Sequence, residues 1–143
     1  MTAQRILDAK GKGAAHIASD ATIADLLNSL KSQNADALVV SDDGCSVDGI
    51  ISEHDVVRGL RMLGPDVLLK SVRDLMTAHV ITCAPSDPVE AIVAIMISKH
   101  VRHLPVVANN KLLGLVSIRD LLRLHLETVS AEAEAMRGYI QNH

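Results

Sequence analysis

An internal repeat with a constant offset of 65 residues constrains this sequence more than any other feature. Gly, Ser, Asp and Arg recur in register as Gly49, Ser52, Asp55 and Arg58, and again as Gly114, Ser117, Asp120 and Arg123. Self-similarity at a fixed period indicates repeated supersecondary units that stack on each other. The chain is therefore predicted to form a pseudo-symmetric pair of halves with two equivalent clefts between them.

Each copy predicts the same order of elements, β-α-β-β-α. A short extended stretch (residues 15–18 and 80–83) precedes a helix with apolar residues at i, i+3, i+4 and i+7, the spacing of one buried face. These residues are Ile23, Leu26, Leu27 and Leu30 in the first copy and Val89, Ile92, Val93 and Met96 in the second. A hairpin of two strands follows (37–40 with 49–51, and 104–107 with 112–116), and a second helix begins at the repeated Ser.

The predicted fold is α/β, with repeat 1 at residues 6–66, a connector at 67–79, repeat 2 at 80–127 and a C-terminal tail helix at 128–143. Val129, Met136 and Ile140 form a thin apolar stripe on the tail. Such a stripe is typical of a helix that covers its own core or a partner's. We therefore expect a homodimer to which these three residues contribute.

Composition argues against several classes of function. The 143 residues carry a net charge of −3 without a basic block and include no Phe or Trp, so a nucleic-acid surface is not expected. The apolar stretches are too short to span a membrane, no signal-peptide pattern opens the chain, and the two cysteines are isolated, which favours a cytoplasmic protein. The histidines lack metal-ligand spacing and no nucleophile–base pair is recognisable, so neither a metal site nor catalysis is expected.

The paired β-α-β-β-α units, the Leu-Pro-Val-Val strand beginning at Leu104 and the two Gly-h-h-Ser-x-x-Asp motifs (h is apolar) resemble the CBS domain, named after cystathionine β-synthase. Residues 72–77 are similar to the segment that joins two such domains, and the resemblance covers residues 6–126. It implies a free-standing CBS pair, a Bateman module of the short bacterial type. Such a module binds AMP, ADP, ATP or NAD(H) between its halves, without an obligatory cofactor, and reports energy or redox state by changing shape or association.

The resemblance also implies which residues bind the nucleotide. Asp55 and Asp120 hold the ribose diol, and Ser52 and Ser117 bond ribose or phosphate oxygens. The extended openings line the clefts, each facing the Asp of the other repeat. The remaining predicted residues are Ile17, Ala18, Thr82, Cys83, Arg102, His103, Pro105 and Arg119.

The repeated motif has a second interpretation that needs no ligand. Ser-x-x-Asp before an apolar run is also a capping box, in which the two side chains satisfy free N–H groups at a helix start. The interpretations are compatible, because a helix N-terminus also attracts phosphate. Arg102 and His103 are either phosphate ligands or ordinary surface residues, and Lys10 or Lys12 could reach a bound phosphate.

The two copies differ in charge around the motif. Arg119 corresponds to His54, and the basic pair Arg102 and His103 corresponds to Ala35 and Asp36. We therefore predict one strong phosphate-binding cleft around Asp120 and a weak or different cleft around Asp55, with Asp36 beside the latter. Two alternative functions stay open: a constitutive dimeric interaction scaffold with vestigial clefts, and a small enzyme.

Overall fold

The computed structural model describes residues 1–11, 13 and 15–141 of the chain. The predicted phosphate contact of Lys12 and the last two positions of the predicted tail, 142 and 143, lie outside the described residues. The first half contains β1 (His16–Ile17), α2 (Ile23–Gln33), β2 (Ala37–Val40), β3 (Gly49–Ser52) and α3 (Glu53–Leu63). This order is the predicted β-α-β-β-α unit.

The sheet of repeat 1 is three-stranded, with β1 parallel to β2 and β2 antiparallel to β3. Helix α2 begins at Thr22, whose hydroxyl accepts a hydrogen bond from the Asp25 N–H at 3.1 Å. Ile23, Leu26 and Leu30 of α2 are buried against the sheet, as the helical spacing predicts. Leu27, predicted on the same face, is instead exposed, because it lies at the margin of that face.

The second half contains α5 (Val89–Lys99), β4 (His103–Ala108), β5 (Lys111–Ser117) and α6 (Ile118–Gln141). Its predicted opening strand at residues 80–83 is reduced to a single parallel bridge between Cys83 and Val106. Cys83 N–H donates to the Pro105 carbonyl and Val107 N–H donates to the Cys83 carbonyl, both at 2.9 Å. Since Pro105 has no N–H, it cannot donate the next hydrogen bond that would extend the strand toward Ile81.

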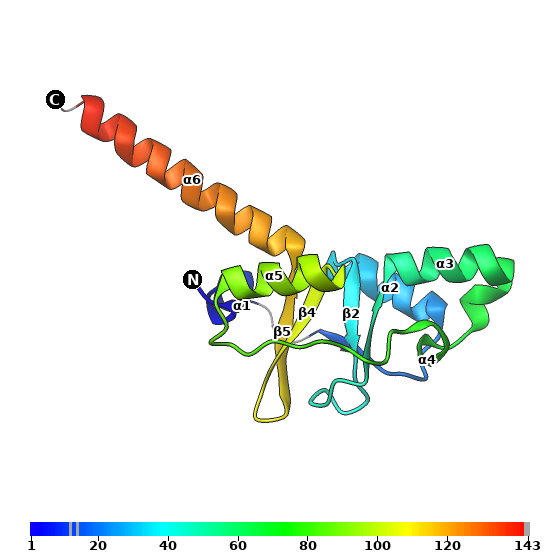
Figure 1. Ribbon diagram of the computed structural model, residues 1–143. Helices are drawn as coiled ribbons and strands as arrows, with labels where there is room; N and C mark the ends of the chain where they lie inside the picture. Colours follow the sequence, from blue (N-terminus) through cyan, green and yellow to red (C-terminus); the bar gives the residue numbers. More distant parts are fainter. Residues whose placement is uncertain (12, 14, 142–143) are drawn as a thin grey trace.

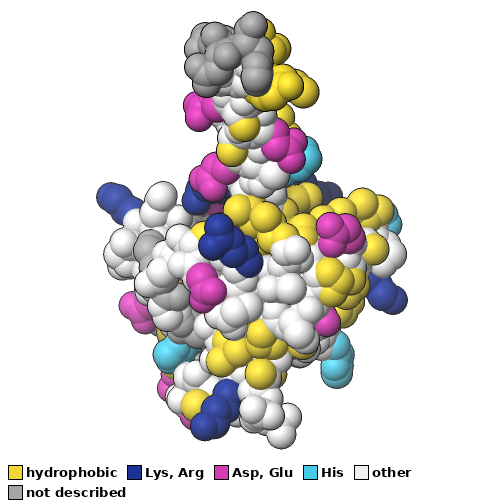
Figure 2. Space-filling view, turned by 90° about the vertical axis from the view of Figure 1, so that its left-hand side faces the viewer, with side chains coloured by type: hydrophobic (Ala, Val, Ile, Leu, Met, Phe, Trp, Pro, Cys, Tyr) yellow, Lys and Arg dark blue, Asp and Glu magenta, His cyan; other side chains and the backbone are white. Residues whose placement is uncertain are grey.

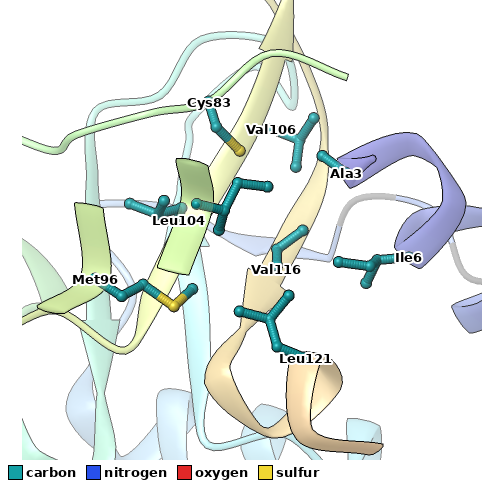
Figure 3. Close-up of a cluster of buried hydrophobic side chains, with 9 residues drawn as sticks. Ala3, Ile6, Cys83, Met96, Leu104, Val106, Val116 and Leu121 are labelled. Atoms are coloured by element: carbon teal, nitrogen blue, oxygen red, sulfur yellow. The ribbon is translucent and has the colours of Figure 1, made fainter. Parts of the chain in front are cut away.

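Helix α1 (Ala3–Lys10) precedes repeat 1 in the chain but packs on repeat 2 (Figure 1). Ala3 and Ile6 point toward Leu104 and Val116 of β4 and β5 and belong to the same buried cluster (Figure 3). Three backbone hydrogen bonds of 3.0 Å tie this end of the chain to the start of α5 and the segment before it, from Ala3 N–H to Asp87, from Gln4 N–H to Pro85 and from Val89 N–H to Met1. The core of repeat 2 is therefore completed by the helix that comes first in the sequence.

The connector between the halves consists of the 3₁₀ helix η1 (Gly64–Leu69), the short helix α4 (Val72–Leu75) and an extended segment that forms an antiparallel bridge with β3. Thr77 and Ile50 exchange two backbone hydrogen bonds of 3.0 and 2.9 Å at that bridge. A Cβ on Gly49 would lie 2.7 Å from the Thr77 carbonyl oxygen, and a Cβ on Gly114 would lie 2.6 Å from Leu7 Cδ2 of α1. In each half the repeated glycine thus leaves room for a neighbouring segment to approach the strand closely: the connector at Gly49 and helix α1 at Gly114.

Helix α6 has 24 residues and extends well beyond the body of the molecule (Figure 1). Several hydrophobic side chains of its projecting part are exposed, among them Leu126, Val129, Met136, Tyr139 and Ile140. Figure 2 shows hydrophobic side chains along this projection. Among the described residues, α6 and the other helices do not combine the length and apolar character needed to cross a bilayer.

Candidate functional site

A cleft of about 290 Å³ opens where the two halves meet. Its walls come from the end of α1, the end of α2, the start of β2, the end of β5 and the first turns of α6. The charged and titratable residues that line it are Lys10, Asp36, His103, Arg119, Asp120 and Arg123. Among the described residues, three permanent cations therefore share the cleft with two carboxylates and one imidazole.

Asp120 lies at the start of α6 and joins Ser117 in the predicted capping arrangement. The Asp120 N–H donates to Ser117 Oγ at 3.1 Å, and the Ser117 N–H donates to Asp120 Oδ2 at 3.0 Å. Only 10% of the Asp120 side chain is exposed, yet it lines the cleft. The capping interpretation of the repeated motif is confirmed here, and it leaves the carboxylate facing the cavity.

Lys10, in the last turn of α1, reaches the same carboxylate from the opposite wall. Its Nζ lies 3.0 Å from Asp120 Oδ2 and donates a second hydrogen bond of 2.8 Å to the Leu115 carbonyl oxygen. Among the described residues, the contacts of the Asp120 carboxylate all use Oδ2. The N-terminal helix thus places a cation directly on the carboxylate that was predicted to hold ribose.

His103 and Asp36 form a second ion pair across the halves, with 3.0 Å between Nε2 and Oδ1. Burial by itself would raise the pKa of Asp36, but the hydrogen bond and charge of His103 and the nearby Arg119 guanidinium hold that pKa below its usual value. The prediction that Asp36 stands beside Asp55 is wrong for its side chain. The backbone of Asp36 lies near the start of α3, where its carbonyl accepts a hydrogen bond of 3.0 Å from the Glu53 N–H. Its carboxylate instead lines the Asp120 cleft.

Asp55, the counterpart of Asp120, has a different environment. Its Oδ2 accepts the Ser52 N–H at 2.9 Å, which repeats the capping arrangement, and its Oδ1 lies 3.6 Å from an Arg58 guanidinium nitrogen. Asp55 lines neither the 290 Å³ cleft nor the adjoining 90 Å³ cavity between α1 and α6. The equivalent of Arg58 in the other half, Arg123, lines the cleft instead.

The remaining predicted residues are divided between the cleft and other places. His103, Ser117 and Arg119 line the cleft with Asp120. Ile17 and Cys83 are buried in the separate cores of the two halves, while Ala18, Thr82, Arg102 and Pro105 are not among the lining residues. Nucleotide contacts from all twelve predicted residues stay predictions.

Cys83 is buried, and its thiol resists deprotonation. Burial, with a smaller contribution from the negative charge of Asp87, raises the pKa of its thiol to about 11. Because the thiolate is the reactive form of cysteine, Cys83 is poorly suited to covalent chemistry near neutral pH. Among the described residues no group of three or more His, Cys, Asp or Glu side chains is arranged to hold a metal ion.

Comparison with known proteins identifies the family of both halves. The model of the CBS domain matches residues 12–61 and 72–127. The chain is 30% identical to the CBS domain-containing protein CBSX3, mitochondrial, of Arabidopsis thaliana, over 98% of this chain and 72% of that protein. Its fold matches the crystal structure of the CBS-domain containing protein ATU1752 from Agrobacterium tumefaciens with a TM-score of 0.83 and 30% identity, covering 87% of this chain and 99% of that one.

Two further solved structures share the fold and hold adenosine ligands. The CBS domain protein PAE2072 from Pyrobaculum aerophilum is complexed with AMP, and it matches at 24% identity with a TM-score of 0.75 over 90% of this chain and 99% of that one. The CBS domain pair of protein MJ0100 is in complex with 5′-methylthioadenosine and S-adenosyl-L-methionine, at 24% identity and a TM-score of 0.79, covering 90% and 98% of the two chains. Both of these proteins thus hold compounds that contain adenosine.

Proposed function

Because the chain belongs to the CBS-domain family, we propose that it is a regulatory module that binds an adenine nucleotide in the Asp120 cleft. The observation that carries the proposal is a cavity of about 290 Å³ at the junction of the halves, in which Asp120 lies with three cations among the described residues, Lys10, Arg119 and Arg123. A volume near 300 Å³ is at the small end of ligand pockets, which suits a mononucleotide. The function is that of a sensor and not of an enzyme.

The ribose and the phosphate of the nucleotide each have a chemical complement in this cleft. A carboxylate is an acceptor for two hydroxyl groups, so Asp120 is assigned the ribose diol. The Ser117 hydroxyl and the Arg119 guanidinium are assigned ribose and phosphate oxygens, since charged hydrogen bonds to phosphate are short and strong. AMP is the proposed ligand, and ADP, ATP and NAD(H) are further members of the same class.

We propose that the two clefts bind unequally. Asp55 is paired with Arg58, and His54 stands where the second half has Arg119, so the first cleft has fewer free cations for phosphate. The Asp120 cleft also contains Asp36, whose carboxylate Oδ1 is hydrogen-bonded to Nε2 of His103 at 3.0 Å. We expect AMP to fill the Asp120 cleft first, and the Asp55 cleft to stay empty or to take a ligand such as NAD(H) without a terminal phosphate.

A homodimer is proposed as the assembled form, in a reducing compartment such as the cytoplasm. The exposed apolar side chains of α3 and α6, including Val57, Leu60, Val129, Met136 and Ile140, provide area for self-association. The same projecting stripe supports the second candidate function, a constitutive scaffold whose α6 binds another protein without any nucleotide. Light scattering with and without AMP separates a ligand-linked dimer from a permanent one.

The direct test is calorimetry of AMP, ADP, ATP, NAD, NADH, 5′-methylthioadenosine and S-adenosylmethionine with the parent protein and Asp120→Ala. At 100 times its dissociation constant, a ligand adds about 2.7 kcal/mol to the free energy of unfolding, so thermal melting gives an independent readout. Asp120→Ala loses a capping contact of about 0.5–2 kcal/mol and stays folded. We expect it to bind AMP at least about a hundredfold more weakly, because charged hydrogen bonds are worth roughly 1.5–3 kcal/mol each.

Asp55→Ala is the matched control, since it removes the same capping contact from the other half and is expected to leave the stronger AMP site intact. Unchanged AMP affinity in Asp120→Ala would show that the motif is only a helix cap. Two equal AMP sites in the parent would contradict the proposed inequality. A parent that binds none of the seven compounds would favour the scaffold.

A further inference from the structure

The N-terminal helix contributes a residue to the ligand cleft of the opposite half. We propose that Lys10 sets the charge class of the ligand, so that the Asp120 cleft takes an adenosine with an anionic 5′ group and disfavours a neutral one. This inference rests on the proposed function and adds a specificity residue from outside the repeated motif. Its basis is the pair of contacts that Lys10 makes, 3.0 Å to Asp120 Oδ2 and 2.8 Å to the Leu115 carbonyl oxygen.

Lys10 competes with ribose for the same carboxylate oxygen. Asp120 Oδ2 already accepts the Ser117 N–H at 3.0 Å in addition to the Lys10 ammonium. A ribose diol that uses both carboxylate oxygens must displace the ammonium, because the Ser117 N–H belongs to the cap of α6 and stays in place. A ribose diol bound through both oxygens therefore separates Lys10 from its counter-charge.

The displaced ammonium cannot simply leave the cleft with its helix. Ala3 and Ile6 hold α1 in the core of repeat 2, so the backbone of Lys10 stays at the cleft wall. The side chain is 33% exposed, and an ammonium group has three donors, of which the Leu115 carbonyl satisfies one. A partly buried charge without a partner carries a desolvation cost.

Within the cleft, as far as the described residues go, the ligand itself is the remaining source of a counter-charge, because Glu127 lines only the adjoining cavity with Lys10. The other carboxylate that lines the cleft, Asp36, is already paired with His103 at 3.0 Å. A 5′-phosphate carries about −1.5 to −2 charges near pH 7 and offers three acceptor oxygens. AMP therefore replaces the partner that Lys10 loses, whereas 5′-methylthioadenosine, with a thioether at the same position, leaves Lys10 unpaired.

The test compares AMP with 5′-methylthioadenosine by calorimetry on the parent, Lys10→Met, Lys10→Arg and Lys111→Met. Lys111 is an exposed lysine at the opposite end of β5 from Ser117, so its variant removes the same charge away from the cleft. The quantity measured is the ratio of the two dissociation constants within each variant. That ratio does not depend on the fraction of folded protein, and thermal melting of each variant checks folding separately.

We expect the parent and Lys111→Met to prefer AMP by about tenfold or more, and Lys10→Arg to keep that preference because it keeps the charge. In Lys10→Met the ratio should fall by about tenfold, with AMP weakened and 5′-methylthioadenosine bound as tightly as in the parent or more tightly. A ratio in Lys10→Met that stays within about threefold of the parent's overturns the inference while leaving the proposed function intact. A parent that binds neither compound overturns both.

Discussion

Replacing each repeated glycine with alanine tests whether the two equivalent positions contribute equally to the free energy of unfolding. In Gly49→Ala the new Cβ would lie 2.7 Å from the Thr77 carbonyl oxygen and 2.8 Å from Met76 Sδ. In Gly114→Ala it would lie 2.6 Å from Leu7 Cδ2 and 3.3 Å from Leu7 Cδ1. The two substitutions are chemically identical, but the first meets backbone and the second meets the end of a side chain.

The expected cost follows from what must move. Relief of the Gly49→Ala clash breaks the two hydrogen bonds between Ile50 and Thr77, at about 0.5–1.5 kcal/mol each. Leu7 can turn away from Gly114→Ala at an off-rotamer cost of about 0.5–1.5 kcal/mol. Ala in place of Gly returns roughly 0.5–1 kcal/mol in both strands through lower chain entropy. Gly49→Ala should therefore lower the free energy of unfolding by about 1–2 kcal/mol, and Gly114→Ala by less than about 1 kcal/mol.

Urea denaturation followed by circular dichroism measures both values, with an unchanged dependence on denaturant as the sign that the unfolding reaction is the same. Gly138→Ala is the control, because nothing lies within 4 Å of a Cβ at this position of α6. It should be neutral or stabilising by up to about 1 kcal/mol. A loss for Gly114→Ala equal to or greater than that for Gly49→Ala would refute the reasoning from backbone against side-chain contact.

Two further predictions concern titratable groups. A thiol reagent at neutral pH should modify the exposed Cys45 and should reach Cys83 only on unfolding, because burial raises the Cys83 pKa to about 11. Rapid labelling of two thiols in the folded parent, or of one thiol in folded Cys45→Ser, would contradict this. The lowered pKa of Asp36 means that its contribution to stability is present above its usual value and is lost as the pH falls through its folded value. Between pH 5 and about pH 3 the parent should lose more stability than Asp36→Asn, by no more than about 1 kcal/mol since the side chain is 41% exposed; an equal loss measured by urea denaturation would argue against it.

The helices and hairpins could be predicted from the sequence because the repeat offers each pattern twice. Apolar spacing located α2 and α5, and the repeated Ser-x-x-Asp located the starts of α3 and α6, since capping is a local interaction. The opening strand of repeat 2 is lost because Pro105 has no N–H to donate to it. The sequence shows this proline, but only the strand pairing shows that the missing N–H would face the segment before Cys83.

The local part of the site could be predicted, and Lys10 was recognisable as a candidate for phosphate but not as a partner of Asp120. Ser117, Arg119 and Asp120 are close in sequence, and the helix start that joins them was recognisable. The partners Lys10 and Asp36 come from 110 and 67 residues away from the groups they contact, and their arrival depends on how the two halves and α1 pack. A one-dimensional alignment of the repeats puts Asp36 beside Asp55 and gives no indication that its carboxylate crosses to His103.

The position of α1 on repeat 2 has a consequence for the order in which the molecule is made. Ala3 and Ile6 leave the ribosome before the other described elements, yet the strands that bury them, β4 and β5, are about a hundred residues further along the chain. At a synthesis rate of ~5–20 residues per second, these apolar side chains stay without their burying strands for roughly 5–20 seconds. Repeat 1 can complete its own core during that interval, whereas the core of repeat 2 is complete only when α1 packs on β4 and β5.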